Sequence, residues 1–128
     1  TKLLKVLKKK YKIRKQNILG HSDVSPDRKK DPGEKFPWDK LAKKKLSKWH
    51  TLNVNQIKIY RNLKIDKNKE KMFLNNLYKI GYSKIFGARL SSKKGNLVKA
   101  FQRRYRQSLI NGKIDKECLF ISQNLIEN

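Results

Sequence analysis

Residues 20–33 read GHSDVSPDRKKDPG, and FPW follows at residues 36–38. Polar and charged residues dominate this stretch, together with two prolines and a glycine at each end. Proline fixes φ and glycine permits a positive φ, so the triplets SPD (25–27) and DPG (31–33) both favour turns. We therefore predict an ordered loop that starts at His21.

The segment before this loop is lysine-rich and predicts two short elements. Leu3, Leu7 and Tyr11 recur every four residues among lysines, which is typical of a short amphipathic helix. Residues 17–20, NILG, end a stretch of alternating apolar and polar residues. That alternation predicts a short strand running into the loop.

The segment after the loop predicts a helix and then a connection. Pro37 suits the first position of a helix, which we expect to extend to about Lys45 with Trp38 in the core. Between residues 51 and 68, asparagine, lysine and scattered isoleucine sustain no clear period. We interpret residues 51–68 as a linker with some strand character.

Three apolar stripes at helical spacing occupy the carboxyl-terminal half, at residues 73–80, 97–105 and 118–125. Gly81 follows the first stripe, where a residue that tolerates positive φ is wanted at a helix end. Asp115 precedes the third stripe as a candidate N-cap. Three short helices of this kind predict a small three-helix bundle.

The composition is strongly basic, with 34 Lys and Arg against 10 Asp and Glu, a formal net charge of +24 over 128 residues. Such a charge suggests a polyanionic partner, for which nucleic acid is the usual candidate. However, the basic residues are spread through every segment, and AT-rich coding would also enrich lysine, asparagine and isoleucine. Nucleic acid is therefore an unfavoured third alternative.

Other sequence features limit the class of protein. No apolar run approaches the ~20 residues needed to cross a bilayer, so we predict no membrane span. Cys118 is the single cysteine, which excludes an internal disulfide, and its expected role is helix packing. The chain begins at Thr1 without a signal-peptide pattern, and we expect a fragment or a processed product.

The stretch at residues 20–33, with FPW after it, resembles the carboxyl-terminal zinc motif of type-2 N-acetylmuramoyl-L-alanine amidases. That family reads His-Ser-Asp, a proline three residues on, Arg-Lys-x-Asp-Pro-Gly and then Phe-x-Trp. Every one of these elements stands here in register. The resemblance implies a zinc-dependent peptidoglycan hydrolase that cuts the amide bond between N-acetylmuramic acid and L-alanine.

Carried over by position, the resemblance makes His21 and Asp31 zinc ligands and Lys29 the cation that steadies the developing oxyanion. A neutral imidazole and a carboxylate are ordinary zinc ligands, and a catalytic zinc keeps three protein ligands and one open position. The family takes its remaining histidine and a general-base glutamate from upstream, and no residue here matches either. His50 lies downstream of the motif, against the family's order, so we expect this chain alone to be inactive.

Residues 69–128 are similar to the helical peptidoglycan-binding domain that is often appended to these amidases. The similarity rests on LYKIGY (77–82), AFQRRY (100–105) and NGKID (111–115), with Ile80 and Asn111 as mild departures. Arg103, Arg104 and Tyr105 offer charge and a ring that suit acidic peptide stems and glycan faces. We predict them as peptidoglycan contacts.

The sequence therefore predicts an α+β remnant of the amidase domain, mostly helix and loop, followed by the three-helix bundle. The expected division is residues 1–50 for the catalytic part, 51–68 for the linker and 69–128 for the binding domain. Zinc is the expected cofactor, and peptidoglycan or muropeptides are the expected partners. A noncatalytic peptidoglycan-binding protein is the alternative. The periplasm or cell envelope is the favoured location, with the cytoplasm left open.

Overall fold

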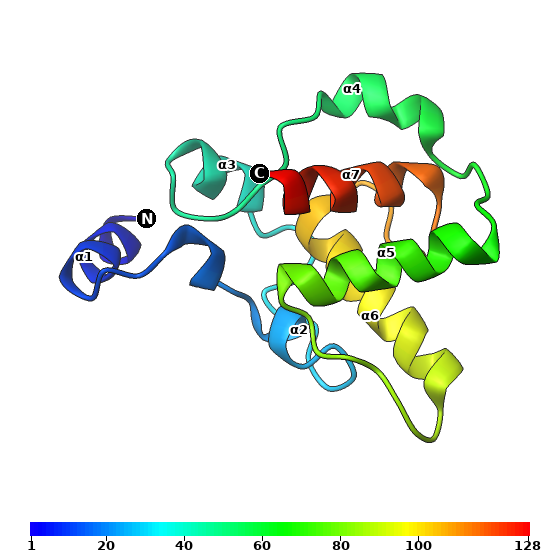
Figure 1. The fold of residues 1–128 in the computed structure, drawn as a ribbon. Coiled ribbons are helices and arrows are strands. Elements are labelled where there is room, and N and C mark those ends of the chain that lie inside the picture. Colours follow the sequence, from blue (N-terminus) through cyan, green and yellow to red (C-terminus); the bar gives the residue numbers. More distant parts are fainter.

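The computed structural model describes all residues from Thr1 to Asn128, and it is mostly helical, as the sequence predicts (Figure 1). Its only β pairing is an isolated antiparallel bridge between Lys64 and Asp115. The helices, in chain order with the two 3₁₀ turns, are α1 (Lys2–Lys10), η1 (Lys15–Asn17), α2 (His21–Val24), α3 (Trp38–Lys43), α4 (Val54–Ile57), η2 (Lys58–Tyr60), α5 (Lys67–Ile80), α6 (Leu90–Tyr105) and α7 (Lys116–Glu127).

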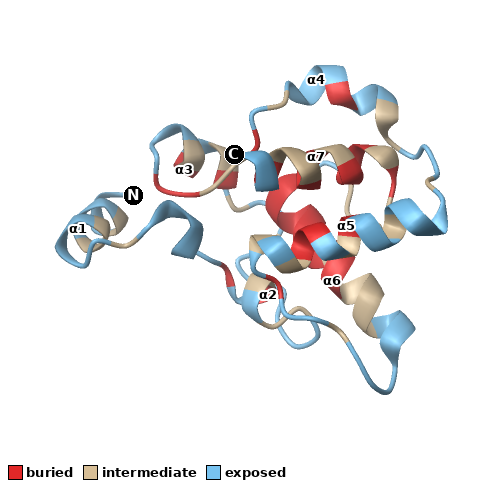
Figure 2. Ribbon diagram, in the orientation of Figure 1, coloured by how far each residue is buried: buried red, intermediate tan, exposed pale blue.

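The main core lies where α5, α6 and α7 meet, and Figure 2 shows the buried positions gathered on α6 and α7. Phe73 of α5 meets Phe101 of α6 edge to face, with ring centroids 5.1 Å apart. Leu77 is fully buried one helical turn after Phe73, which explains the four-residue spacing in the sequence. α5 ends at Gly81, whose φ of 129° confirms the predicted helix stop.

The carboxyl-terminal half of α6 is buried on nearly every side. Its residues from Leu97 to Tyr105 include eight buried positions, two of them arginines. Gln102 also organises the chain reversal before α7. Its Oε1 accepts the backbone N–H groups of Asn111 and Gly112, and its Nε2 donates to the carbonyl of Lys113. α6 is therefore the element around which the neighbouring segments are arranged.

Asp115 is the N-cap of α7, as the sequence predicts, and it also pairs with a buried arginine. Its carboxylate accepts from the backbone N–H groups of Cys118, at 2.9 Å, and Asn62, at 3.1 Å, and from Nη1 of Arg106. Burial raises the pKa of Asp115, but these hydrogen bonds outweigh it, so the pKa lies below its ordinary value. Cys118 is fully buried in the core, in agreement with its predicted packing role.

The segment that we predicted as a linker packs on the carboxyl-terminal helices. Ile57 of α4 belongs to the main core. Arg61 forms a two-pronged ion pair with Glu117 at the start of α7, with both N–O distances 2.9 Å. The boundaries at 51 and 68 stay a prediction.

The strand character predicted for residues 17–20 and 51–68 is wrong. Residues 15–17 form η1, and residues 54–60 form α4 and η2, whereas Lys64 makes only the single bridge. A strand is stabilised by hydrogen bonds to a neighbouring strand. The structure offers these residues no such neighbour, so they form short helical turns and irregular backbone instead.

A second, smaller core supports the amino-terminal segment. Trp38, Leu41 and Leu46 are its buried members, which confirms the predicted burial of Trp38. Trp49 packs against both cores and so connects them. α1 lies at the periphery with no buried residue (Figure 2). No helix in the structure combines the length and the apolar character that crossing a membrane requires.

We expect the Asp115→Asn substitution to destabilise the fold in a pH-dependent way. It leaves Arg106 buried without its charged partner, which costs about 3–5 kcal/mol for a buried pair. Because the folded-state pKa of Asp115 lies below its unfolded value, its contribution is complete above about pH 4 and is lost as the pH falls through the folded-state pKa. Urea unfolding of the wild type and of Asp115→Asn, at pH 7 and at pH 3, measures the loss in the free energy of unfolding at each pH.

The matched control is Asp66→Asn. Asp66 is the N-cap of α5 and accepts from the backbone N–H of Lys69, but it is exposed and has no arginine partner. Asparagine is as good an N-cap as aspartate, so this change should cost less than about 0.5 kcal/mol. Equal losses for the two variants would contradict the role assigned to the Arg106 pair.

Candidate metal centre

The loop at residues 20–33 begins with one helical turn, α2, where we had predicted loop from His21 onward. The loop closes because the Ser22 N–H donates to the carbonyl of Asp31 at 2.9 Å. Gly20 lies so close to Pro32 that an added Cβ would stand 2.5 Å from the proline Cδ. Only glycine fits there without displacing Pro32, so these contacts hold the two ends of the loop together.

This closure brings together the two predicted zinc ligands. Nδ1 of His21 and Oδ2 of Asp31 are hydrogen-bonded to each other across ten residues of sequence. Both side chains face solvent, with exposed fractions of 74% and 58%. The hydrogen bond to His21 is the main cause of the lowered pKa of Asp31, so this carboxylate is ionised at neutral pH. An imidazole nitrogen and a charged carboxylate oxygen thus converge where a metal ion can reach them.

Lys29 lies in the same loop, on the turn that its backbone N–H makes with the carbonyl of Ser25 at 2.9 Å. Its side chain is exposed. The hydrogen bond to His21 is the largest cause of the lowered pKa of Asp31, and the positive charge of Lys29 is the smallest of the contributing causes. Its ammonium group therefore acts on the His21–Asp31 pair, which is compatible with the predicted electrostatic role.

The His21 imidazole and the Asp31 carboxylate are ligand types that suit a zinc ion, but two ligands are fewer than a catalytic zinc site needs. A catalytic zinc takes three protein ligands, and no group of three or more His, Cys, Asp or Glu side chains gathers in this structure. His50 is buried, is stacked on Trp49, and burial is the main cause of its lowered pKa. It therefore belongs to the packing between the two cores and not to the exposed pair.

Asp23 anchors the loop to the rest of the molecule. Its Oδ2 accepts from the backbone N–H of Gly20 at 3.0 Å and from Nη1 of Arg104 at 2.9 Å, and its Oδ1 accepts from the hydroxyl of Tyr82 at 2.8 Å. The bond to Gly20 is a local contact between the Asp23 side chain and the backbone at the start of the loop. The guanidinium of Arg104 also lies 3.6 Å from the ring centroid of Trp38. Nothing in the local sequence indicates that Asp23, Tyr82 and Arg104 meet.

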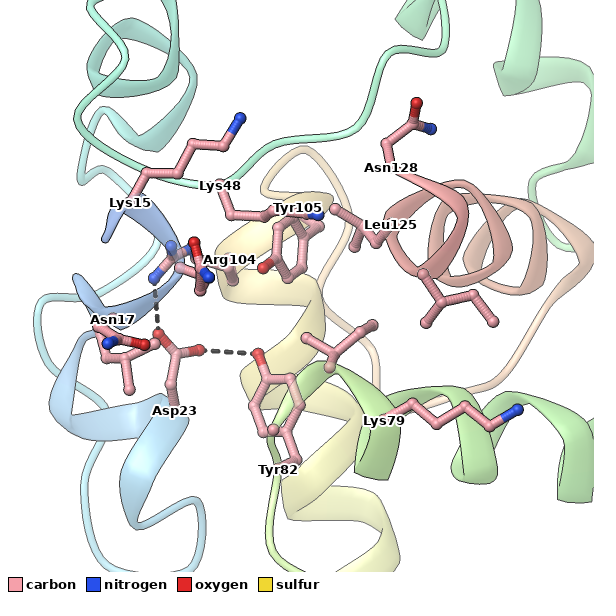
Figure 3. A pocket seen from close by; sticks show the side chains of 15 residues that line it. Lys15, Asn17, Asp23, Lys48, Lys79, Tyr82, Arg104, Tyr105, Leu125 and Asn128 are labelled. Atoms are coloured by element: carbon pink, nitrogen blue, oxygen red, sulfur yellow. Dashed lines mark hydrogen bonds and ion pairs between the residues drawn. The ribbon is translucent and has the colours of Figure 1, made fainter. Parts of the chain in front are cut away.

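Arg103, Arg104 and Tyr105, the predicted peptidoglycan contacts, are buried, with exposed fractions of 8%, 2% and 6%. The charge of Arg104 is neutralised by Asp23 within the protein. Arg104 and Tyr105 nevertheless line a cavity beside the loop, and Figure 3 shows them there together with Asp23. Arg103 does not line this cavity. The contact of these three residues with peptidoglycan stays a prediction.

No family model matches the chain. Among curated proteins, it is 28% identical over 118 residues to the N-acetylmuramoyl-L-alanine amidase AmiD of Escherichia coli K12. The matched region is 92% of this chain and 42% of AmiD. It is 51% identical over 39 residues to the 1,6-anhydro-N-acetylmuramyl-L-alanine amidase AmpD of Haemophilus influenzae. This matched region is 30% of this chain and 21% of AmpD. The chain is similar to N-acetylmuramoyl-L-alanine amidases. It spans less than half the length of these two relatives.

Solved amidase structures contain the same fold. AmiD of E. coli, in complex with anhydro-N-acetylmuramic acid-L-Ala-D-γ-Glu-L-Lys, matches with a TM-score of 0.82 and 29% identity, over 98% of this chain and 48% of that one. AmpDh3 of Pseudomonas aeruginosa, in complex with anhydromuramic pentapeptide, matches with a TM-score of 0.79 and 25% identity. This match covers 98% of this chain and 49% of the AmpDh3 chain. The backbone fold of this chain therefore recurs as about half of each of these two structures.

We expect Asp23→Asn to loosen the loop and lower the stability. It leaves Arg104 buried without an anionic partner, at a cost of about 3–5 kcal/mol. Urea unfolding measures the loss, and the NMR signal of the His21 imidazole reports the loosening. Asp27→Asn is the matched control, because Asp27 lies exposed in the same loop and accepts only from Asn96. A loss under about 0.5 kcal/mol is expected there, and a similar loss in both variants would contradict the anchoring role of Asp23.

Proposed function

We propose that this chain is the part of a zinc-dependent N-acetylmuramoyl-L-alanine amidase that supplies two metal ligands and a helical wall-binding unit. The observation that carries the proposal is the convergence of His21 and Asp31 on one exposed point, in a motif that matches the amidase zinc motif in register. The amidase relatives and structures support it, because their likeness extends over nearly the whole of this chain.

In this function His21 and Asp31 would hold the zinc ion. A zinc ion in such a site lowers the pKa of its bound water toward ~7 and polarises the substrate carbonyl. The ammonium group of Lys29 would stabilise the negative charge that develops on the carbonyl oxygen. Asp23 would hold the loop, and so the spacing of His21 and Asp31, through its bonds to Arg104 and Gly20.

The proposed reaction is hydrolysis of the amide bond between N-acetylmuramic acid and L-alanine, in degradation or recycling of the cell wall. It needs a third ligand and a general base from residues outside this chain. A two-ligand site binds zinc weakly, so we propose that the 128 residues alone are inactive. The substrate class favours the periplasm or cell envelope, with recycling in the cytoplasm as the alternative location.

A noncatalytic peptidoglycan-binding protein is the second candidate. One observation favours it: the main core lies outside the loop that bears His21 and Asp31, so its packing does not depend on a metal ion. The excess of 24 positive charges would help either protein to associate with anionic wall polymers. Zinc binding separates the two candidates.

The first test is zinc binding by the full translation product of the gene, measured by calorimetry. We expect tight binding, and His21→Ala and Asp31→Ala should each lower the zinc affinity. Removing a residue that only supports a ligand typically lowers metal affinity about 10- to 100-fold, so the loss of a ligand itself should be larger. The 128-residue chain should bind weakly. Asp27→Ala, in the same loop, is the control and should leave the affinity unchanged. Absence of zinc binding in the full product would overturn the amidase proposal in favour of the wall-binding one.

The second test addresses Lys29. In the full product we expect Lys29→Gln to lower kcat for muropeptide hydrolysis by about 10²–10³, the usual effect of removing one oxyanion-stabilising group. Zinc affinity should not change, because the ammonium group is not a ligand. Lys30→Gln, which makes the same change at the next residue, should keep nearly full activity. Equal losses at both positions would show a general effect of loop charge instead.

A further inference from the structure

The carboxyl-terminal end of α6 contacts the segments on both sides of the loop at residues 20–33. Nη2 of Arg104 donates a hydrogen bond to the carbonyl of Ile18, just before the loop, at 3.1 Å. Nε2 of Gln107, just after α6 ends, donates to the carbonyl of Phe36, just after the loop, at 2.7 Å. One short stretch of the carboxyl-terminal half therefore holds both the entry and the exit of this loop.

Arg104 also holds the first turn of the loop. Its Nη1 donates to Oδ2 of Asp23 at 2.9 Å, and Figure 3 shows this bond together with the one from Tyr82 to the other carboxylate oxygen. Asp23 follows His21 within the single turn α2. Because Arg104 bonds to Ile18 and to Asp23, it fixes the backbone before and after His21.

Trp38 connects Arg104 with the backbone of both predicted ligands. The guanidinium of Arg104 lies 3.6 Å from the ring centroid of Trp38. A Cβ added to Gly20 would stand 3.3 Å from Cζ2 of this ring and 3.4 Å from the backbone oxygen of Asp31. The ring thus packs beside the arginine and beside the place where the backbone before His21 meets that of Asp31.

The loop cannot fix the two predicted zinc ligands by its own packing. Among residues 20–33 only Gly20 and Ser22 are buried, so the loop has no apolar core, and both ligand side chains are exposed. Arg104, in contrast, is 2% exposed and makes its contacts inside the protein. Its position is therefore set by the packing of α6 and not by the loop.

We propose that Arg104 is a positioning residue of the metal centre, and that Gln107 supports it by holding the exit of the loop. Neither side chain binds the metal ion. Together they keep the His21 imidazole and the Asp31 carboxylate at a separation that lets both bind one zinc ion. The inference rests on the proposed zinc site and assigns part of its geometry to the carboxyl-terminal helical unit.

The first comparison measures zinc affinity of the full translation product by calorimetry. Arg104→Met removes every donor and should weaken zinc binding about 10- to 100-fold, the usual effect of losing a residue that supports a ligand. Arg104→Lys keeps a charge beside Asp23 but lacks the planar fork that reaches both Asp23 and Ile18, so an intermediate loss is expected. The visible absorption spectrum of the Co²⁺-substituted product should also change in Arg104→Met, because it reports the geometry of the ligands.

Arg106→Met is the matched control. Arg106 is buried like Arg104 and pairs with Asp115, but its hydrogen-bond partners all lie between Leu109 and Asp115, outside the loop. Urea unfolding should show that both variants lose stability, whereas only Arg104→Met should lose zinc affinity. Unchanged zinc affinity in Arg104→Met, or an equal loss in both variants, would overturn the positioning role.

A milder pair of variants decides the case in which Arg104→Met does not fold. Gln107→Leu removes one hydrogen bond at a half-buried site and should weaken zinc binding about fivefold. Gln123→Leu makes the same change at a half-buried site of α7, where the side chain donates to Met72, and should have no effect. Equal zinc affinities of these two variants would contradict the proposal.

A metal-free measurement separates this proposal from the proposed function. In the 128-residue chain with EDTA, hydrogen exchange at the Ser22 amide, which donates to the Asp31 carbonyl, reports closure of the loop. Arg104→Met should speed this exchange about tenfold or more, and Arg106→Met should not. If the full product binds no zinc, the proposed function fails, and the exchange result still decides whether Arg104 positions His21 and Asp31. Tight zinc binding with unchanged Ser22 exchange in Arg104→Met would overturn the positioning role alone.

Discussion

The buried ion pair between Asp23 and Arg104 is the interaction on which the rest of this structure depends. It joins the loop that carries His21 and Asp31 to the most buried helix of the carboxyl-terminal half. Tyr82 adds a third element to the same carboxylate. Such a pair adds little net stability compared with apolar packing, but removing one partner is costly because the other charge stays buried. It therefore determines where the loop sits more than how stable the fold is.

The same solution recurs wherever this basic chain buries an acid. Asp115 pairs with Arg106 at the start of α7, and Glu117 pairs with Arg61 two residues later. In a chain with 34 basic and 10 acidic residues, each buried carboxylate has arginine partners available, whereas most lysines stay at the surface. Arginine suits these positions because its planar guanidinium carries several directed N–H groups. Arg61 donates two of them to Glu117, whereas Arg104 and Arg106 each donate one to their aspartate and another to a backbone carbonyl.

The candidate metal centre and the cavity illustrate two opposite uses of the loop. His21 and Asp31 are exposed, so a metal ion and further ligands can approach them. Asp23, two residues after His21, points the other way, into the protein, and forms part of the cavity wall (Figure 3). Two residues of an α-helix are rotated by about 200°, so the single turn α2 directs His21 and Asp23 to opposite sides. The loop therefore presents the proposed metal ligands on one side while its other side forms part of the cavity wall.

The sequence by itself determined the helical stripes, the stop at Gly81, the N-cap at Asp115 and the register of the loop motif, because each depends on residues close together in the chain. It wrongly predicted strands, because a strand depends on a neighbour that a local pattern cannot specify. Tertiary structure alone decided that Arg104 is paired inside the protein, that Tyr82 meets Asp23, and that three lysines surround one cavity. The two contacts to Asp23 join residues 59 and 81 positions apart, and only the packing of the loop against the carboxyl-terminal half brings them together.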